Sequence, residues 1–123
     1  MTKILVVDDS RMARNLTVVP LEEAGYTVLG VEPTSLYLIL KRIYEFVPDL
    51  VITDYQMPNC DGEFLVQAIR QDPNFGRLPI MVVTSHRDSD LAERLSQHGI
   101  SGLLFKSSGM HELVNRVGEL LPP

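Results

Sequence analysis

Five short runs of apolar, often β-branched residues recur along the chain, and segments of helical period separate them. The runs cover residues 4–7, 26–31, 50–53, 78–83 and 101–105. Runs this short and this apolar are typical of strands buried on both faces of a sheet. Strands that alternate with helices predict an α/β fold, a parallel sheet with helices on both faces.

For five such units we expect the flavodoxin-like strand order 2-1-3-4-5, which has its switch point between the first and third strands. Asp9 or Ser10 is expected to cap the first helix, Gly25 to end it and Pro20 to bend it. The expected core positions are Met12, Ala13, Leu16 and Val19 in the first helix, Leu36, Ile39, Leu40, Ile43 and Val47 in the second, and Phe64, Leu65, Ala68 and Ile69 in the third.

Composition limits the classes of protein that this chain can belong to. Its 123 residues predict one domain over residues 1–123, and a net charge of -5 without any Lys/Arg run argues against binding to nucleic acid. The single cysteine, Cys60, excludes an internal disulfide and metal-binding cysteine pairs, and it fits a reducing cytoplasm. No apolar run approaches the roughly 20 residues that a membrane span needs.

Polar residues stand at the ends of four of the five predicted strands. Asp8 and Asp9 follow the first strand, Asp54 the third, Thr84 the fourth and Lys106 the fifth. In open parallel sheets these ends share one edge, where ligands collect. Each residue alone has a simpler interpretation: a helix cap, a strand residue or a solvated charge. Their coincidence at one edge favours a common site.

Three carboxylates at one edge would repel each other, since a pair about 4 Å apart costs roughly 4 kcal/mol at an effective dielectric of about 20. A divalent cation relieves this repulsion, and oxygen ligands of this kind suit Mg²⁺. The chemistry that uses all these groups is phosphoryl transfer to a carboxylate. Asp54 would be the nucleophile, the cation and Lys106 would neutralise charge on the transferring oxygens, and the Thr84 hydroxyl would bind one of them.

The sequence resembles a two-component response-regulator receiver domain, similar in size to the single-domain chemotaxis regulators. Residues 5–11 (LVVDDSR), 54–62 (DYQMPNCDG), 82–85 (VVTS) and Lys106 match the blocks of that family in order and spacing. The resemblance implies a non-enzymatic signalling domain whose Asp54 accepts phosphate from a histidine kinase or phosphotransfer protein. It also implies that Asp9, Asp54 and the backbone carbonyl of Gln56 bind Mg²⁺, with Asp8 acting through water.

Two positions depart from the family pattern. Ser107 stands where the family usually has a proline after the lysine, often with a cis peptide bond; a non-proline cis bond costs about 3 kcal/mol, so we expect a trans bond and a rearranged loop. Leu103 stands where the family commonly has a Tyr or Phe whose ring couples the threonine to the face made by the fourth helix, fifth strand and fifth helix, and the ring is missing here. Gln56 and His86 lie where the family tunes dephosphorylation.

The sequence is also compatible with other functions. Leu103 and Ser107 motivate a receiver-like scaffold that binds partners without phosphorylation. A metal-dependent phosphatase with an aspartate nucleophile is less favoured, since Asp8 is followed two residues later by Ser10 rather than by an acid. Nucleotide binding lacks a Gly-rich loop. No output domain follows Leu121, so we expect the chain to act through a downstream protein, through a homodimer, or as part of a longer protein.

Overall fold

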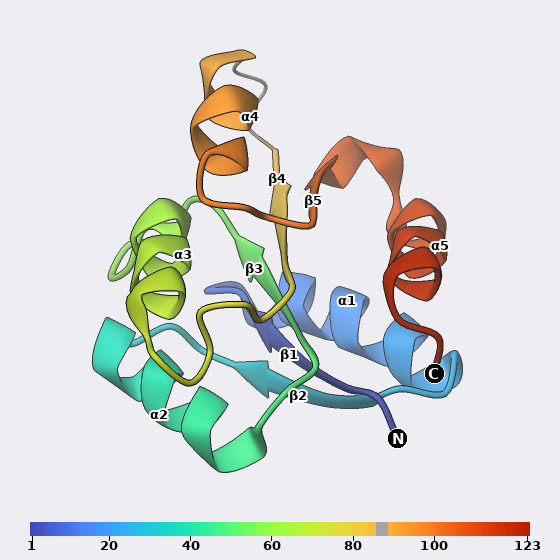
Figure 1. The fold of residues 1–123 in the computed structure, drawn as a ribbon. Helices are drawn as coiled ribbons and strands as arrows, with labels where there is room; N and C mark the ends of the chain where they lie inside the picture. Colours follow the sequence, from blue (N-terminus) through green and yellow to red (C-terminus); the bar gives the residue numbers. More distant parts are fainter. Residues whose placement is uncertain (86–88) are drawn as a thin grey trace.

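A computed structural model describes residues 1–85 and 89–123 of the chain (Figure 1). Five strands alternate with five α-helices, and a short 3₁₀ turn, η1, follows the last strand. In chain order the elements are β1 Lys3–Val7, α1 Arg11–Glu23, β2 Thr27–Val31, α2 Leu36–Phe46, β3 Leu50–Asp54, α3 Gly62–Gln71, β4 Ile80–Thr84, α4 Ser89–Ser96, β5 Gly102–Phe105, η1 Lys106–Ser108 and α5 Met110–Leu120.

The strands form one sheet in the order β2-β1-β3-β4-β5, and every neighbouring pair is parallel. The predicted fold class and strand order are therefore confirmed. Strand β1 lies between β2 and β3, so the chain places β2 on one side of β1 and then crosses to the other side to add β3, β4 and β5. The edge between the carboxyl ends of β1 and β3 is thus the switch point of the sheet.

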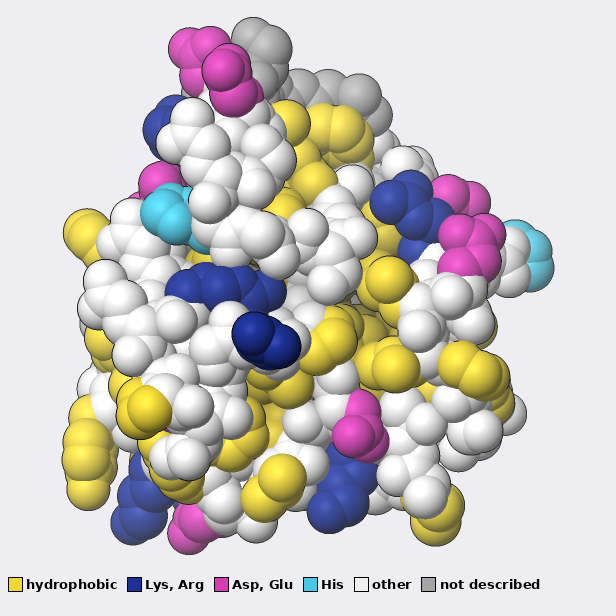
Figure 2. All heavy atoms as spheres, in the orientation of Figure 1, with side chains coloured by type: hydrophobic (Ala, Val, Ile, Leu, Met, Phe, Trp, Pro, Cys, Tyr) yellow, Lys and Arg dark blue, Asp and Glu magenta, His cyan; other side chains and the backbone are white. Residues whose placement is uncertain are grey.

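Side chains alternate along each strand between two buried layers. Residues such as Leu5, Val51 and Val82 pack under α2, α3 and α4, whereas Val6, Ile52 and Val83 pack under α1 and α5. Figure 1 shows these two groups of helices on opposite sides of the sheet. Basic, acidic and apolar side chains are interspersed on the face of the molecule in Figure 2.

The predicted core stripe of α1 is wrong. Met12, Leu16 and Val19 are exposed, and the side chains buried on this helix are Thr17 and Leu21. Positions 17 and 21 are one turn apart and satisfy the helical period as well as the predicted stripe does. Thr17 can be buried because its hydroxyl donates a hydrogen bond to the Ala13 carbonyl oxygen.

The ends of α1 agree with the sequence, since Ser10 caps the helix through a hydrogen bond from the Ala13 amide to its hydroxyl. The helix continues through Pro20, and Gly25 follows it with a positive φ. The bend expected at Pro20 stays a prediction. In α3 the prediction of an inward Phe64 is wrong, because Phe64 is exposed and Val66 is buried in its place.

Val47 was expected in the core but lies exposed at the C-cap of α2, in the left-handed region at φ 53°. That conformation costs a residue with a Cβ about 1–2 kcal/mol, and it ends the helix where glycine usually does.

We expect Val47→Gly to raise the free energy of unfolding by about 0.5–1 kcal/mol, after the greater chain entropy of glycine is subtracted. Urea denaturation measures this change. A loss of stability in Val47→Gly would contradict the assigned backbone strain.

Candidate functional site

The polar residues singled out in the sequence lie at the carboxyl edge of the sheet. Asp8 and Asp9 directly follow β1, Asp54 ends β3, and Lys106 directly follows β5. Asp8, Asp54 and Lys106 lie in phase with Val6, Ile52 and Leu104, whose side chains all face α1 and α5. The period of the strands therefore directs these three side chains to the same side of the sheet.

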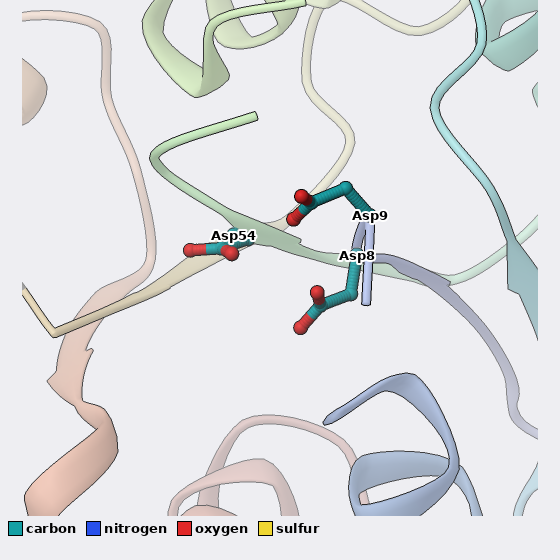
Figure 3. Close-up of side chains that lie close together, drawn as sticks. All are labelled: Asp8, Asp9 and Asp54. Carbon is teal, nitrogen blue, oxygen red and sulfur yellow. The ribbon is translucent and has the colours of Figure 1, made fainter. Parts of the chain in front are cut away.

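The three carboxylates converge at the switch point between β1 and β3. One oxygen from each of Asp8, Asp9 and Asp54 lies within 4.8 Å of the other two. Figure 3 shows the Asp9 carboxylate extending toward Asp54, while Asp8 leaves the chain in a different direction, toward the helices below. Asp8 and Asp54 are buried and Asp9 is exposed, so the cluster opens to solvent on the Asp9 side.

Lys106 partly balances this charge. Its Nζ lies 3.2 Å from Asp54 Oδ2, to which it donates a hydrogen bond, and 3.7 Å from Asp8 Oδ2. Burial alone lowers the pKa of Lys106, but the two neighbouring carboxylates outweigh it and the pKa is raised. Burial raises the pKa of Asp54, with Lys106 opposing the rise and Asp8 adding to it. Lys106 therefore contacts two of the three acids, and the three carboxylates outnumber the single ammonium group beside them, which leaves an excess of negative charge.

Backbone groups hold the two buried carboxylates in place. The Ser10 amide donates to Asp8 Oδ1 at 2.9 Å, and the Tyr55 amide donates to Asp54 Oδ1 at 2.8 Å. The Arg14 guanidinium donates to the backbone oxygen of Asp8 at 2.7 Å. The sequence interpretation did not assign these roles to Ser10, Arg14 and Tyr55. An aspartate side chain after a strand often accepts a hydrogen bond from the backbone amide two residues later, so the contact between Asp8 and the Ser10 amide could have been predicted.

The loop after Asp54 is closed by the start of α3. Asp61 caps this helix by accepting a hydrogen bond from the Glu63 amide at 2.7 Å. The Gly62 amide donates to the backbone oxygen of Tyr55 at 2.8 Å. A Cβ at position 62 would lie 2.6 Å from the backbone oxygen of Asp54. The first residue of α3 therefore touches the backbone of the Asp54 peptide, and only glycine fits there.

Thr84 and Gln56 lie nearby, but not in the group of charged side chains. Thr84 ends β4 and is buried; in the register Asp54 pairs with Val83, the residue before it. Gln56 is exposed in the loop two residues after Asp54. His86 lies outside the described residues.

The predicted trans bond after Lys106 is confirmed, and the chain there forms the 3₁₀ turn η1. Leu103 is half-buried against the α2–α3–α4 layer.

A cavity of about 160 Å³ adjoins the cluster. Asp8, Asp54 and Lys106 contribute to its lining, and its other walls are side chains of the sheet, α1 and α5, mostly apolar: Val6, Val7, Ala13, Leu16, Thr17, Ile52, Val83 and Met110. The acids thus stand where an apolar interior meets solvent. In such a setting electrostatic interactions are stronger than in water.

The donor set fits a hard divalent cation. Carboxylate oxygens within 4.8 Å of one another can bind one ion together, and the exposed Asp9 leaves room for water ligands. Mg²⁺ prefers such sites, which combine one or two carboxylates with waters and phosphate oxygens. The arrangement can therefore hold a metal beside a carboxylate that a lysine also contacts.

The sequence matches the family model of the response regulator receiver domain over residues 4–118. The chemotaxis protein CheY of Pseudomonas aeruginosa is 30% identical over 104 residues, which cover 85% of this chain and 83% of that protein. The hybrid signal transduction histidine kinase D of Dictyostelium discoideum is 34% identical over 82 residues, 67% of this chain but 5% of the kinase. The match thus spans a small part of that first relative, and 53% of the BvgA regulator of Bordetella pertussis.

Solved structures share the whole fold. The chemotaxis protein CheY4 of Vibrio cholerae superimposes with a TM-score of 0.89 at 26% identity, covering 98% of this chain and 99% of that one. A putative response regulator from Chloroflexus aurantiacus superimposes with a TM-score of 0.88 at 31% identity, covering 99% and 98%. Within the described residues no helix combines the length and the hydropathy that crossing a bilayer would require.

Proposed function

The chain belongs to the response regulator receiver domain family, and on this premise we propose that it is a phosphorylation-switched signalling domain with Asp54 as its phosphoacceptor. The observation that carries this proposal is the cluster of Asp8, Asp9, Asp54 and Lys106 at the switch point of the sheet. We assign the domain to residues 1–123. Its role is regulatory: it accepts a phosphoryl group rather than turning over a substrate.

In the proposed reaction, a carboxylate oxygen of Asp54 attacks the phosphorus atom of a phosphohistidine. A phosphorus–oxygen bond forms, the phosphorus–nitrogen bond breaks, and the histidine nitrogen leaves with its electron pair. No general base is needed, because a carboxylate is already ionised at neutral pH. Lys106, which contacts Asp54 Oδ2, neutralises charge on the transferring oxygens, and the Thr84 hydroxyl binds one of them.

Asp9, Asp54 and the backbone carbonyl of Gln56 are the proposed ligands of Mg²⁺, with Asp8 acting through water. When bound, the ion supplies positive charge beside the carboxylate and the phosphoryl oxygens. The excess negative charge of the cluster supports this assignment.

A phosphorylation-independent scaffold is the competing function, motivated by Leu103 and Ser107. The retained acids and the lysine contact argue against it, since a scaffold would not need three carboxylates held together at an energetic cost. Incubation with acetyl phosphate and Mg²⁺ decides between them. We expect the intact mass to rise by one phosphoryl group, and no rise in Asp54→Asn or in the presence of EDTA. An unchanged mass in the wild-type protein would favour the scaffold.

Mg²⁺ should stabilise the folded protein, because the ion binds a site that exists only in the folded state. At a Mg²⁺ concentration about 100 times the dissociation constant, the free energy of unfolding should rise by about 2.7 kcal/mol.

Asp9→Asn should weaken Mg²⁺ binding by about tenfold or more, yet stabilise the metal-free protein by relieving repulsion between the carboxylates. Urea denaturation with and without Mg²⁺ measures both effects.

Glu119→Gln, on the exposed side of α5, is the control for the loss of one negative charge. It should leave the Mg²⁺ effect at its wild-type size. An equal Mg²⁺ effect in Asp9→Asn and in the wild-type protein would remove Asp9 from the proposed ligand set.

The partners that we propose are a histidine kinase or phosphotransfer protein as donor and a downstream protein as target, in the cytoplasm. The names of the relatives support these classes, since they include two histidine kinases and a transcription regulator. We assign neither nucleic acid nor a membrane as a ligand of this domain, given its net charge of -5. A homodimer is a further proposed assembly, and gel filtration of the phosphorylated and unphosphorylated forms tests it.

A further inference from the structure

Arg94 connects helix α4 to Tyr55, the residue that follows the proposed phosphoacceptor Asp54. Arg94 Nη2 donates a hydrogen bond to the Tyr55 hydroxyl at 3.0 Å, and Arg94 Nε lies 3.4 Å from Glu63 Oε1 in α3. His98 follows the end of α4, and its Nε2 lies 3.5 Å from Glu63 Oε2. Polar contacts thus connect the outer side of α4 to α3 and to the loop after β3.

Tyr55 is bound at both ends. Its backbone amide donates to Asp54 Oδ1 at 2.8 Å, while its side-chain hydroxyl accepts from Arg94. Two hydrogen bonds, one at the Tyr55 amide and one at the Tyr55 hydroxyl, therefore connect the carboxylate of Asp54 to Arg94 in α4. This path does not pass through Thr84 or through Leu103.

Helix α4 is well placed to respond to a small change at Tyr55. It has eight residues, and among those from 90 to 96, whose side chains are described, Leu91 and Leu95 are buried. In Figure 1 it extends beyond the end of the sheet. An element with so few buried apolar groups opens or shifts at a low free-energy cost.

We propose that the Tyr55–Arg94 hydrogen bond is the link through which this chain couples the state of Asp54 to the position of α4. The inference rests on the proposed function, since it needs a phosphoryl group on Asp54. Once one oxygen of Asp54 carries the phosphoryl group, the two carboxylate oxygens no longer share a negative charge. Oδ1 is then a weaker acceptor for the Tyr55 amide. Tyr55 then moves and its hydroxyl leaves Arg94, whose contact with Glu63 is kept in both positions of α4.

In this scheme the Tyr55–Arg94 bond stabilises the unphosphorylated position of α4. Its removal must therefore favour the other position and, by linkage, strengthen the binding of a phosphoryl group or its mimic. A contact that merely supports the fold would not strengthen that binding when it is lost. This difference in sign separates the proposal from a structural role.

The experiment uses beryllofluoride with Mg²⁺ as the phosphoryl mimic on the full chain. Tyr55→Phe removes only the hydroxyl, and Arg94→Met keeps most of the apolar stem. We expect each variant to bind beryllofluoride about 2- to 5-fold more tightly than the wild-type protein. The double variant should match either single variant, because both remove the same bond. Isothermal titration calorimetry gives these affinities.

Amide NMR spectra supply the second measurement. In the unliganded variants, the amides of residues 90–96 should already be displaced toward their beryllofluoride-bound positions. Arg42→Met is the matched control, since Arg42 is an exposed helical arginine paired with Glu45 on α2, and it should behave as the wild-type protein does.

Affinities at or below the wild-type value, or additive effects in the double variant, would overturn the Tyr55–Arg94 link while leaving the phosphoacceptor proposal intact. If the wild-type protein bound no beryllofluoride and the Asp54 amide did not shift, the proposed function itself would fail, and this inference with it.

Discussion

Replacing Lys106 by methionine should slow the phosphorylation of Asp54 by acetyl phosphate about 100-fold or more. Lys106 Nζ lies 3.2 Å from Asp54 Oδ2 and 3.7 Å from Asp8 Oδ2, so its charge is placed where negative charge gathers during transfer. Removing one preorganised group of this kind costs about 3 kcal/mol of transition-state stabilisation. Methionine keeps the length and the apolar stem of lysine, so the change isolates the charge. Intact-mass time courses at a fixed Mg²⁺ concentration measure the rate.

Lys106→Met should also leave Asp54 harder to ionise, because Lys106 opposes the rise that burial imposes on the pKa of that carboxyl. Lys41→Met, at an exposed position of α2, is the matched control and should phosphorylate at the wild-type rate. A rate in Lys106→Met within threefold of the wild-type rate would show that the lysine contact has no part in transfer.

Replacing Gly62 by alanine should destabilise the fold by about 3 kcal/mol or more. The added Cβ would lie 2.6 Å from the backbone oxygen of Asp54 and 2.8 Å from Tyr55 Cα. Neither atom belongs to a flexible side chain, so the overlap forces a backbone shift, which is the costly form of overpacking. Because the shift displaces Asp54 itself, phosphorylation should slow as well, by about 100-fold for a displacement near 1 Å.

Gly118→Ala is the control for Gly62→Ala. Gly118 is exposed within α5, and the nearest atom to a Cβ there, the Tyr26 hydroxyl oxygen, would lie 4.0 Å away. Alanine is the better helix former, so this variant should gain about 0.5–1 kcal/mol. Urea denaturation should give opposite signs for the two substitutions. Similar stabilities would mean that the chain after Asp54 yields to the added methyl group.

The sheet and the positions of the charged residues could be predicted from the sequence because they depend on local patterns. A run buried on both faces identifies itself by composition, and the residue that follows it then lies at the carboxyl edge. Asp8, Asp54 and Lys106 are directed to one side by the strand period alone. Their proximity follows from the strand order, which the short alternating elements favour.

The orientation of α1 could not be predicted in the same way. Two sets of positions, one through Leu16 and one through Leu21, satisfy the helical period, and tertiary packing buries the second. The left-handed Val47 has no local sequence signal, since a β-branched residue is unfavourable there. The contacts of Tyr55 and Arg94 join residues far apart in sequence, and the packing of α3 and α4 decides them.

We propose that the negative cluster directs a phosphoryl group to one carboxylate, that of Asp54. The most direct test phosphorylates the protein with acetyl phosphate and Mg²⁺, reduces the acyl phosphate with borohydride, and locates the resulting homoserine by tandem mass spectrometry. We predict homoserine at position 54 and unmodified aspartates at positions 8 and 9. Homoserine at either of those positions, or at none of the three, would contradict the assignment of Asp54 as the phosphoacceptor.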